Sequence, residues 1–308
     1  MTADSSFPEL VFSKNQHMKI GYNGSWFNLR QNASDTWSIS YGKIQRPPLD
    51  YRTECSVAAE EIFKLAQRPL YLGFSGGVDS EVVAESLRLA GIPFAALIMR
   101  FPNHLNNHDI CFAESYCQRW KIECHYFDID PLDYYKSVEF KNRTEAVHCL
   151  YPMLALQAKA LEYIDKTLNG FGIMGGGDFL FAGAEHQPTI IKHNEISGSV
   201  LRLQIKFGIP GIYRFFRWSP ELMAAFFLDP FIQKLMQATE RNRDFNSSVK
   251  LKFYQTHFAL SERPKYYGWE NFNVVEDQIR TELRTKFLYA TTILEHSEKS
   301  FLKLLGIL

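Results

Sequence analysis

The sequence predicts an α/β protein in which a parallel sheet with flanking helices precedes a mostly helical C-terminal region. Between residues 68 and 190, short apolar runs alternate with amphipathic stretches, the order that parallel strands joined by helices require. Two of these runs end in glycine-rich turns, at 75–77 and 175–177. Ligands of open α/β sheets bind at the carboxyl ends of strands, so we expect both turns to face one ligand.

Residues 1–67 are expected to form an N-terminal segment of short strands and one helix. The alternating run Trp37–Tyr41 predicts a short strand within a small meander, which Pro47 and Pro48 close. A helix is predicted over 52–67. The repeating strand and helix pattern starts only after this segment.

Four strands and three helices are predicted within 68–190, the core of the protein. The predicted strands are 70–74, 94–99, 124–127 and 171–174. The predicted helices are 79–90, a helix with Ile110, Ala113, Cys117 and Trp120 on one face, and 145–168. Residues 191–308 are predicted to pack on the core as a mostly helical region that includes a helix over 276–296.

Composition favours a globular cytoplasmic protein. Lys plus Arg and Asp plus Glu both total 34 of 308 residues, so net charge gives no general attraction to nucleic acid or membranes. No apolar run reaches the length of a membrane span, and residues 1–20 lack the pattern of a secretory signal. Five cysteines without paired spacing suit a reducing compartment.

The run Ser75-Gly76-Gly77-Val78-Asp79-Ser80 follows a predicted buried strand and starts a predicted helix. Backbone amides at such a turn have no intrahelical partner and lie at the positive end of the helix dipole, so they suit phosphate oxygens. Glycine lets the phosphates approach and tolerates positive φ. Ser-Gly-Gly is also a common turn, and Asp and Ser are ordinary helix caps. The combination with the strand favours the phosphate site.

This run resembles the PP-loop of the N-type ATP pyrophosphatases, the superfamily of the asparagine, argininosuccinate, NAD and GMP synthetases. The resemblance implies that ATP is cleaved between its α and β phosphates, with an adenylated substrate as intermediate. It also implies that ATP is bound by Ser75, Gly76, Gly77, Asp79 and Ser80.

The second turn, Met174 to Gly183, resembles a glycine-rich asparagine synthetase segment in its glycines, its Asp178 and the Leu-Phe that follows. The resemblance implies that Asp178 and Asp79 hold Mg²⁺ at the leaving pyrophosphate, and Mg²⁺ prefers such oxygen ligands. Taken alone, the turn is equally explained as a strand-to-helix connection with an Asp cap. Gly176 replaces the family's glutamate, which is tied to ammonia attack, and Phe179 replaces a second acidic residue.

A third stretch, Lys250 to Lys265, resembles the helix, turn and Arg-x-Lys sequence of the same enzymes. The resemblance implies that Lys265 stabilises charge as pyrophosphate departs, with Arg263 as a weaker candidate for that role. A solvated surface turn explains both residues equally well. The similarity covers roughly residues 68 to 272, in the order of the motifs.

The resemblance therefore implies an AMP-forming ligase of the asparagine synthetase-like kind that uses ATP and Mg²⁺ on a small-molecule substrate. The segment before the loop is too short for a glutaminase domain, so the nucleophile is expected to be free ammonia, an amine or ammonia from a partner protein. Two alternatives remain: a nucleobase- or tRNA-modifying relative, and an ATP-binding sensor or partner subunit without turnover.

Two further features could be functional, but we favour a purely structural explanation for each. Cys111, Cys117 and Cys124 lack metal-ligand spacing and are expected to be buried apolar thiols. The stretch Tyr213–Trp218 could bind nucleic acid by stacking, but a core helix with snorkelling arginines is preferred because the net charge is balanced.

Overall fold

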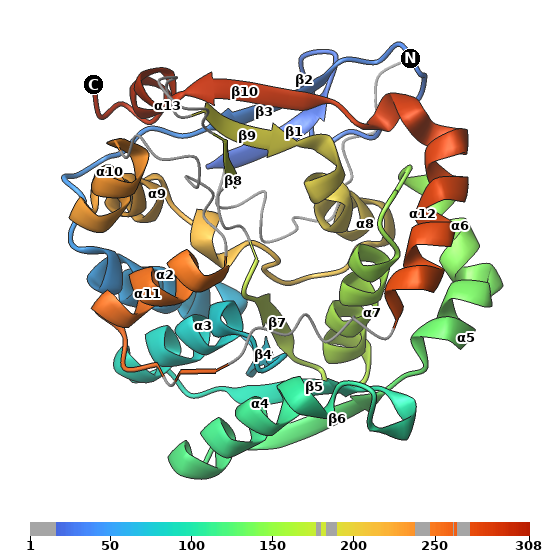
Figure 1. Cartoon of the computed structure of the whole chain (residues 1–308), viewed down its shortest axis with the longest axis horizontal. Coiled ribbons are helices and arrows are strands. Elements are labelled where there is room, and N and C mark those ends of the chain that lie inside the picture. Colours follow the sequence, from blue (N-terminus) through green and yellow to red (C-terminus); the bar gives the residue numbers. More distant parts are fainter. Residues whose placement is uncertain (1–16, 177–179, 183–189, 238–246, 261, 264–271) are drawn as a thin grey trace.

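The computed structural model of the chain describes residues 17–176, 180–182, 190–237, 247–260, 262–263 and 272–308 (Figure 1). Within these ranges no helix is both long enough and apolar enough to cross a membrane.

A four-stranded parallel sheet forms the centre of the predicted core, which confirms the predicted α/β class. Its strands follow the order β6-β5-β4-β7, and every neighbouring pair is parallel. Their bounds are Leu70–Gly73 for β4, Ala95–Arg100 for β5, Cys124–Asp128 for β6 and Phe171–Met174 for β7. Each matches a predicted strand. The interior strands β4 and β5 are mainly apolar because neighbours and helices cover them, whereas the edge strand β6 includes His125 and Asp128.

Helices cover both faces of this sheet (Figure 1). Leu72 and Ile98 of one face join a core cluster with apolar residues of three helices: α2 (Tyr51–Ala66), α3 (Val78–Leu89) and α4 (Asn107–Trp120). Leu97 and Met174 of the other face join a second cluster with α7 (Pro152–Lys166). Alternate residues along the strands thus supply two separate cores.

The helix predicted over 145–168 is wrong in its first third. Two short helices, α5 (Pro131–Lys136) and α6 (Val138–Ala146), come before this stretch, and α6 ends at its start. After a break, the chain forms α7. His148 has a φ of +50°, which no α-helix accommodates. Pro152 lacks an amide hydrogen and stands at the start of α7, where none is needed.

The C-terminal region contains a second sheet that the sequence pattern did not predict. Its strands are β8 (Leu180–Ala182), β9 (Ile190–Asn194) and β10 (Ile293–Ser297), antiparallel in the order β10-β9-β8. The helix predicted over 276–296 is correct only as far as α12 (Asn273–Phe287). The last residues of the predicted stretch belong to β10 instead. The other helices of this region are α8 (Ser199–Phe207), α9 (Pro220–Leu228), α10 (Pro230–Gln237), α11 (Ser247–His257) and α13 (Glu298–Leu304).

The N-terminal meander is present as predicted. Its strands β1 (Met18–Tyr22), β2 (Ser25–Trp26) and β3 (Trp37–Tyr41) are antiparallel in the order β2-β1-β3. Ile20, Tyr22 and Trp37 share a small core cluster with Leu201 and Ile205 of α8. The N-terminal segment thus packs on the C-terminal region. The division into 1–67, 68–190 and 191–308 stays a prediction.

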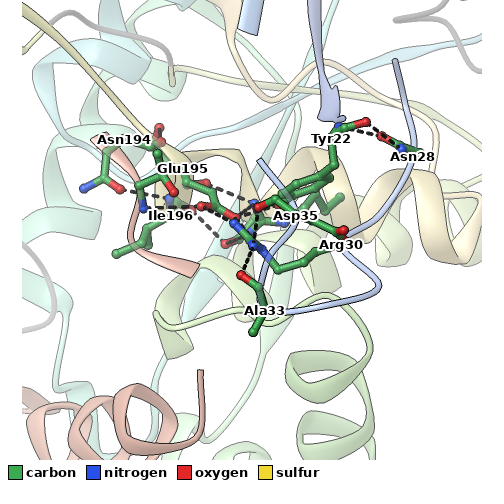
Figure 2. Close-up of polar contacts among 12 residues, drawn as sticks. Tyr22, Asn28, Arg30, Ala33, Asp35, Asn194, Glu195 and Ile196 are labelled. Atoms are coloured by element: carbon green, nitrogen blue, oxygen red, sulfur yellow. Dashed lines mark hydrogen bonds and ion pairs between the residues drawn. The ribbon is translucent and has the colours of Figure 1, made fainter. Parts of the chain in front are cut away.

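Glu195 lies at the centre of a buried polar network that joins these distant segments (Figure 2). Its carboxylate forms an ion pair with Arg30, with 3.0 Å between Oε2 and Nη2, and accepts a hydrogen bond of 2.7 Å from the Tyr22 hydroxyl. The Tyr22 oxygen in turn accepts a hydrogen bond from Arg202 of α8. One buried carboxylate therefore compensates the charge of two buried guanidinium groups.

We expect Glu195→Ala to lower the free energy of unfolding by about 3–5 kcal/mol, because removing one partner leaves buried charge without compensation. Urea titration followed by circular dichroism measures this change. Glu295→Ala is the matched control: Glu295 pairs with Lys192 at the surface of the neighbouring strand, and its loss should cost less than about 1 kcal/mol. Equal losses for the two variants would contradict the assignment.

Candidate nucleotide-binding site

The phosphate-binding loop predicted at 75–80 lies where β4 ends and α3 begins. Gly76 has a φ of +86°, and a Cβ added there would lie 2.0 Å from the Asp109 carbonyl oxygen. Only glycine meets both conditions. Helix geometry leaves the amides of the first turn of α3 without an intrahelical partner. Gly77, which precedes the first helical residue, offers no side chain to cap them.

Serine hydroxyls border these amides. Ser75 Oγ accepts a hydrogen bond from the Gly77 amide at 3.2 Å and lies 3.3 Å from Ser80 Oγ. Ser80 Oγ also donates to the Gly77 carbonyl oxygen at 2.8 Å. The loop therefore presents amides, hydroxyls and the positive end of the α3 dipole together, a combination that suits an anion.

A cavity of about 270 Å³ opens beside the loop, and both glycine-rich turns line it. Gly175 packs directly on the loop, because a Cβ added there would lie 2.9 Å from the carbonyl carbon of Asp79. The predicted convergence of the two turns is thus confirmed for Gly175 and Gly176. The polar lining includes Ser75, Gly77, Asp79, Ser80, Asn106, Asp109, Gln157 and Tyr213, and the apolar lining includes Leu97, Met99, Phe101, Met153, Ala160 and Met174.

Such a division of polar and apolar walls is typical of sites for ligands with one charged and one apolar end. A triphosphate suits the loop side, and a purine base suits the methionine-rich side. The apolar wall comes from β5, β7 and α7, which only the folded sheet brings next to the loop.

Asp79 makes two contacts that the sequence did not predict. Its Oδ2 pairs with Lys250 Nζ at 2.8 Å, and its Oδ1 accepts a hydrogen bond of 2.9 Å from the Tyr254 hydroxyl. Lys250 and Tyr254 stand four residues apart on α11, so they lie on one face of that helix. The i, i+4 spacing of Lys250 and Tyr254 was the one sequence signal for a shared helix face. The sequence near Lys250 does not show that this face meets Asp79, 171 positions earlier.

Arg263 also contacts the loop. Its guanidinium forms an ion pair with Glu81 of α3 and donates a hydrogen bond to the Gly76 carbonyl oxygen. Burial lowers the pKa of Arg263 to about 10, so the group stays charged at neutral pH. Arg263 therefore contacts the backbone of the loop at Gly76 and the side chain of Glu81 in the first turn of α3. Its proposed role in charge stabilisation stays a prediction. Asp178 and Lys265 lie outside the described residues.

The donors present at the loop fit a magnesium–nucleotide complex. Asp79 offers a carboxylate that is about one-third exposed, and Ser75 and Ser80 offer hydroxyl oxygens, all on the wall of one cavity. Hard oxygen donors next to a phosphate-binding loop are what Mg²⁺ requires when phosphates supply the rest of its shell. Among the residues that the structure describes, no cluster of three or more His, Cys, Asp or Glu side chains could hold a metal by itself.

The cysteine prediction is correct only in part. Cys117 is buried, whereas Cys124 is half-buried and Cys111 is exposed. Trp120, expected on the buried face of α4, is 43% exposed, and its ring lies 4.1 Å from the guanidinium carbon of Arg88.

A smaller cavity of about 50 Å³ shares Tyr213 with the large one, and Arg214 and Arg217 line it. The stretch Tyr213–Trp218 is core, as preferred, but as a short 3₁₀ turn whose arginines are buried and do not snorkel. Arg214 donates to the carbonyl and hydroxyl oxygens of Ser197, and burial together with nearby Arg217 lowers its pKa to about 10. Buried positive charge thus lies beside the large cavity.

The fold and the loop define an α/β protein with a glycine-rich loop and a cavity at the carboxyl edge of a parallel sheet. No family model and no curated protein matches the chain. Among solved structures, the NMN synthetase from Francisella tularensis is 16% identical, with a TM-score of 0.33 over 70% of this chain and 98% of that chain. The NH3-dependent NAD synthetase from Campylobacter jejuni subsp. jejuni NCTC 11168 is 16% identical, with a TM-score of 0.30 over 79% and 95%. Both TM-scores are low, so the fold assignment depends on the sheet of this chain and not on these likenesses.

We expect Gly76→Ala to abolish ATP binding, because its Cβ would push the loop away from Asp109. Isothermal titration calorimetry measures the binding, and urea titration measures the accompanying loss of stability. Gly91→Ala is the matched control: Gly91 has a φ of +68° with open space around it, so only the backbone cost of roughly 1–2 kcal/mol applies. ATP binding by Gly76→Ala with wild-type affinity would refute the assignment of the loop.

Proposed function

We propose that this protein is an ATP-dependent adenylating enzyme that cleaves ATP to AMP and pyrophosphate. The activated group would be a carboxylate or carbonyl oxygen of a small molecule, which ammonia or another nucleophile then attacks, as in asparagine synthetase-like PP-loop enzymes. The observation that carries the proposal is the Ser75–Ser80 loop, whose amides and hydroxyls line one cavity with Gly175 and Gly176.

The residues of the loop would position the triphosphate. The first-turn amides of α3 and the Ser75 and Ser80 hydroxyls would hold phosphate oxygens, and the methionine-rich wall would receive the base. Asp79 and, as a second proposed ligand, Asp178 would hold Mg²⁺, which would supply positive charge to neutralise the charge that develops on the phosphates. Lys265 is proposed to add a positive charge at the departing pyrophosphate.

The buried arginines support an anionic acceptor. Arg214 and Arg217 line the small cavity next to Tyr213, where they contact Ser197, Tyr41 and His193, and an anion placed close to them would gain from their charge. A carboxylate acceptor therefore fits better than a neutral nucleobase. The aromatic stretch Tyr213–Trp218, a possible nucleic-acid surface by its sequence, is part of the core, since Phe215 and Phe216 are buried.

Gly176 stands where asparagine synthetases carry the glutamate tied to ammonia attack, so this position argues against amidation by their mechanism and does not identify the nitrogen source. We propose that the nucleophile is free ammonia or an amine, or that a partner protein delivers it, in the cytoplasm. A protein that binds ATP without turnover is the alternative that the next experiment distinguishes.

Incubation with [α-³²P]ATP, Mg²⁺, ammonium and small carboxylic acids is expected to yield AMP, resolved by thin-layer chromatography. Asp79→Asn should reduce AMP formation by at least about a hundredfold, because it removes the carboxylate that faces the phosphates. Asp128→Asn is the matched control, since Asp128 ends strand β6 but pairs with exposed Arg100. Release of ADP would refute the proposal, and ATP binding without AMP would favour the sensor.

A further inference from the structure

Helix α11 places a lysine on the carboxylate that is proposed to hold the metal. Both oxygens of Asp79 are engaged, Oδ2 by Lys250 Nζ and Oδ1 by the Tyr254 hydroxyl. The Lys250 side chain is only 12% exposed, so its ammonium is directed into the protein toward the loop and not into solvent. Of the pair, Asp79 lines the cavity, and the Lys250 ammonium reaches it from behind with little exposure to solvent, so salt screens the pair less than a surface pair.

The two carboxylates in the first turn of α3 have different partners. Glu81 is buried and pairs with Arg263, which also donates to the Gly76 carbonyl oxygen and so is fixed at two points. Asp79 is the more exposed carboxylate and pairs with a lysine, whose flexible four-carbon stem lets its charge move. Of the two cations that contact the loop within the described residues, Lys250 has the side chain better suited to change partner.

A divalent cation on Asp79 would stand next to the Lys250 ammonium, and the two like charges would repel each other at that distance. The negative charge gained at the same moment is that of the phosphates, since Asp79 and the phosphate-binding amides line the same cavity. A shift of the ammonium from Oδ2 to a phosphate oxygen would exchange one charge-assisted hydrogen bond for another. Tyr254 can remain on Oδ1 throughout.

We propose that Lys250 is a phosphate-binding residue which occupies Asp79 until the metal–nucleotide complex arrives and then transfers its ammonium to the polyphosphate. Tyr254 acts as a positioning residue that keeps the Asp79 carboxylate oriented in both states. The inference rests on the proposed function, which supplies the metal–nucleotide complex as the ligand. It adds Lys250 to the site, a residue that the sequence did not identify as functional.

The proposal makes two opposite predictions for Lys250→Met. Binding of Mn²⁺ alone, measured by electron paramagnetic resonance, should become tighter because the metal no longer competes with the ammonium for Asp79. Binding of MgATP, measured by calorimetry, should weaken about tenfold or more because a charge-assisted hydrogen bond to phosphate is lost. A merely structural lysine would not move the two affinities in opposite directions.

Lys252→Met is the matched control, since Lys252 is exposed on the same helix two residues further on, and both affinities should stay at the wild-type level. Lys250→Arg keeps the charge and should retain most of the MgATP affinity, which also shows that the position tolerates substitution. The proposal is overturned if Lys250→Met leaves both affinities unchanged or lowers both. Wild-type protein that binds MgATP but forms no AMP would refute the proposed function while leaving this test intact.

Discussion

Negative charge beside a phosphate-binding loop is the constraint on which the rest of the site depends. The first turn of α3 carries Asp79 and Glu81 next to amides that suit anions, so the carboxylates would repel a triphosphate if they were not neutralised. Lys250 and Arg263 supply the compensating charges, and both come from one segment of the C-terminal region. The phosphate-binding loop of the sheet and the C-terminal helix α11 therefore form one electrostatic unit.

The same segment fixes the shape of the loop as well as its charge. Gly76 adopts its left-handed conformation because it has no Cβ, and the Asp109 carbonyl oxygen of α4 occupies the place where a Cβ would be. Arg263 donates a hydrogen bond to the Gly76 carbonyl oxygen. A second, separate network around Glu195 ties the N-terminal meander to α8 and β9 (Figure 2). The cavity thus lies within a scaffold in which distant segments are joined by buried ion pairs, whose loss is costly.

Local patterns were sufficient for the loop and insufficient for its surroundings. Ser75 to Ser80 could be identified because glycines, hydroxyls and the strand before them are adjacent in sequence. The role of Asp79 was predicted, but its partners Lys250 and Tyr254 were not, since an i, i+4 pair on a helix says nothing about what that face meets. Arg263, the weaker candidate for charge stabilisation, contacts Glu81 and the loop backbone, two contacts that the sequence did not predict, and its role toward the phosphates stays a prediction.

The sequence by itself determined the parallel core and the glycine-rich turn between β4 and α3, because apolar runs and glycines act on their immediate neighbours in the chain. Tertiary structure alone decided where helices end and strands pair: His148 breaks the long helix, and Ile293–Ser297 becomes a strand because β9 offers an edge to pair with. It also decided that Lys250 neutralises Asp79. Pairing and charge compensation depend on distance in space, which a pattern along the chain does not contain.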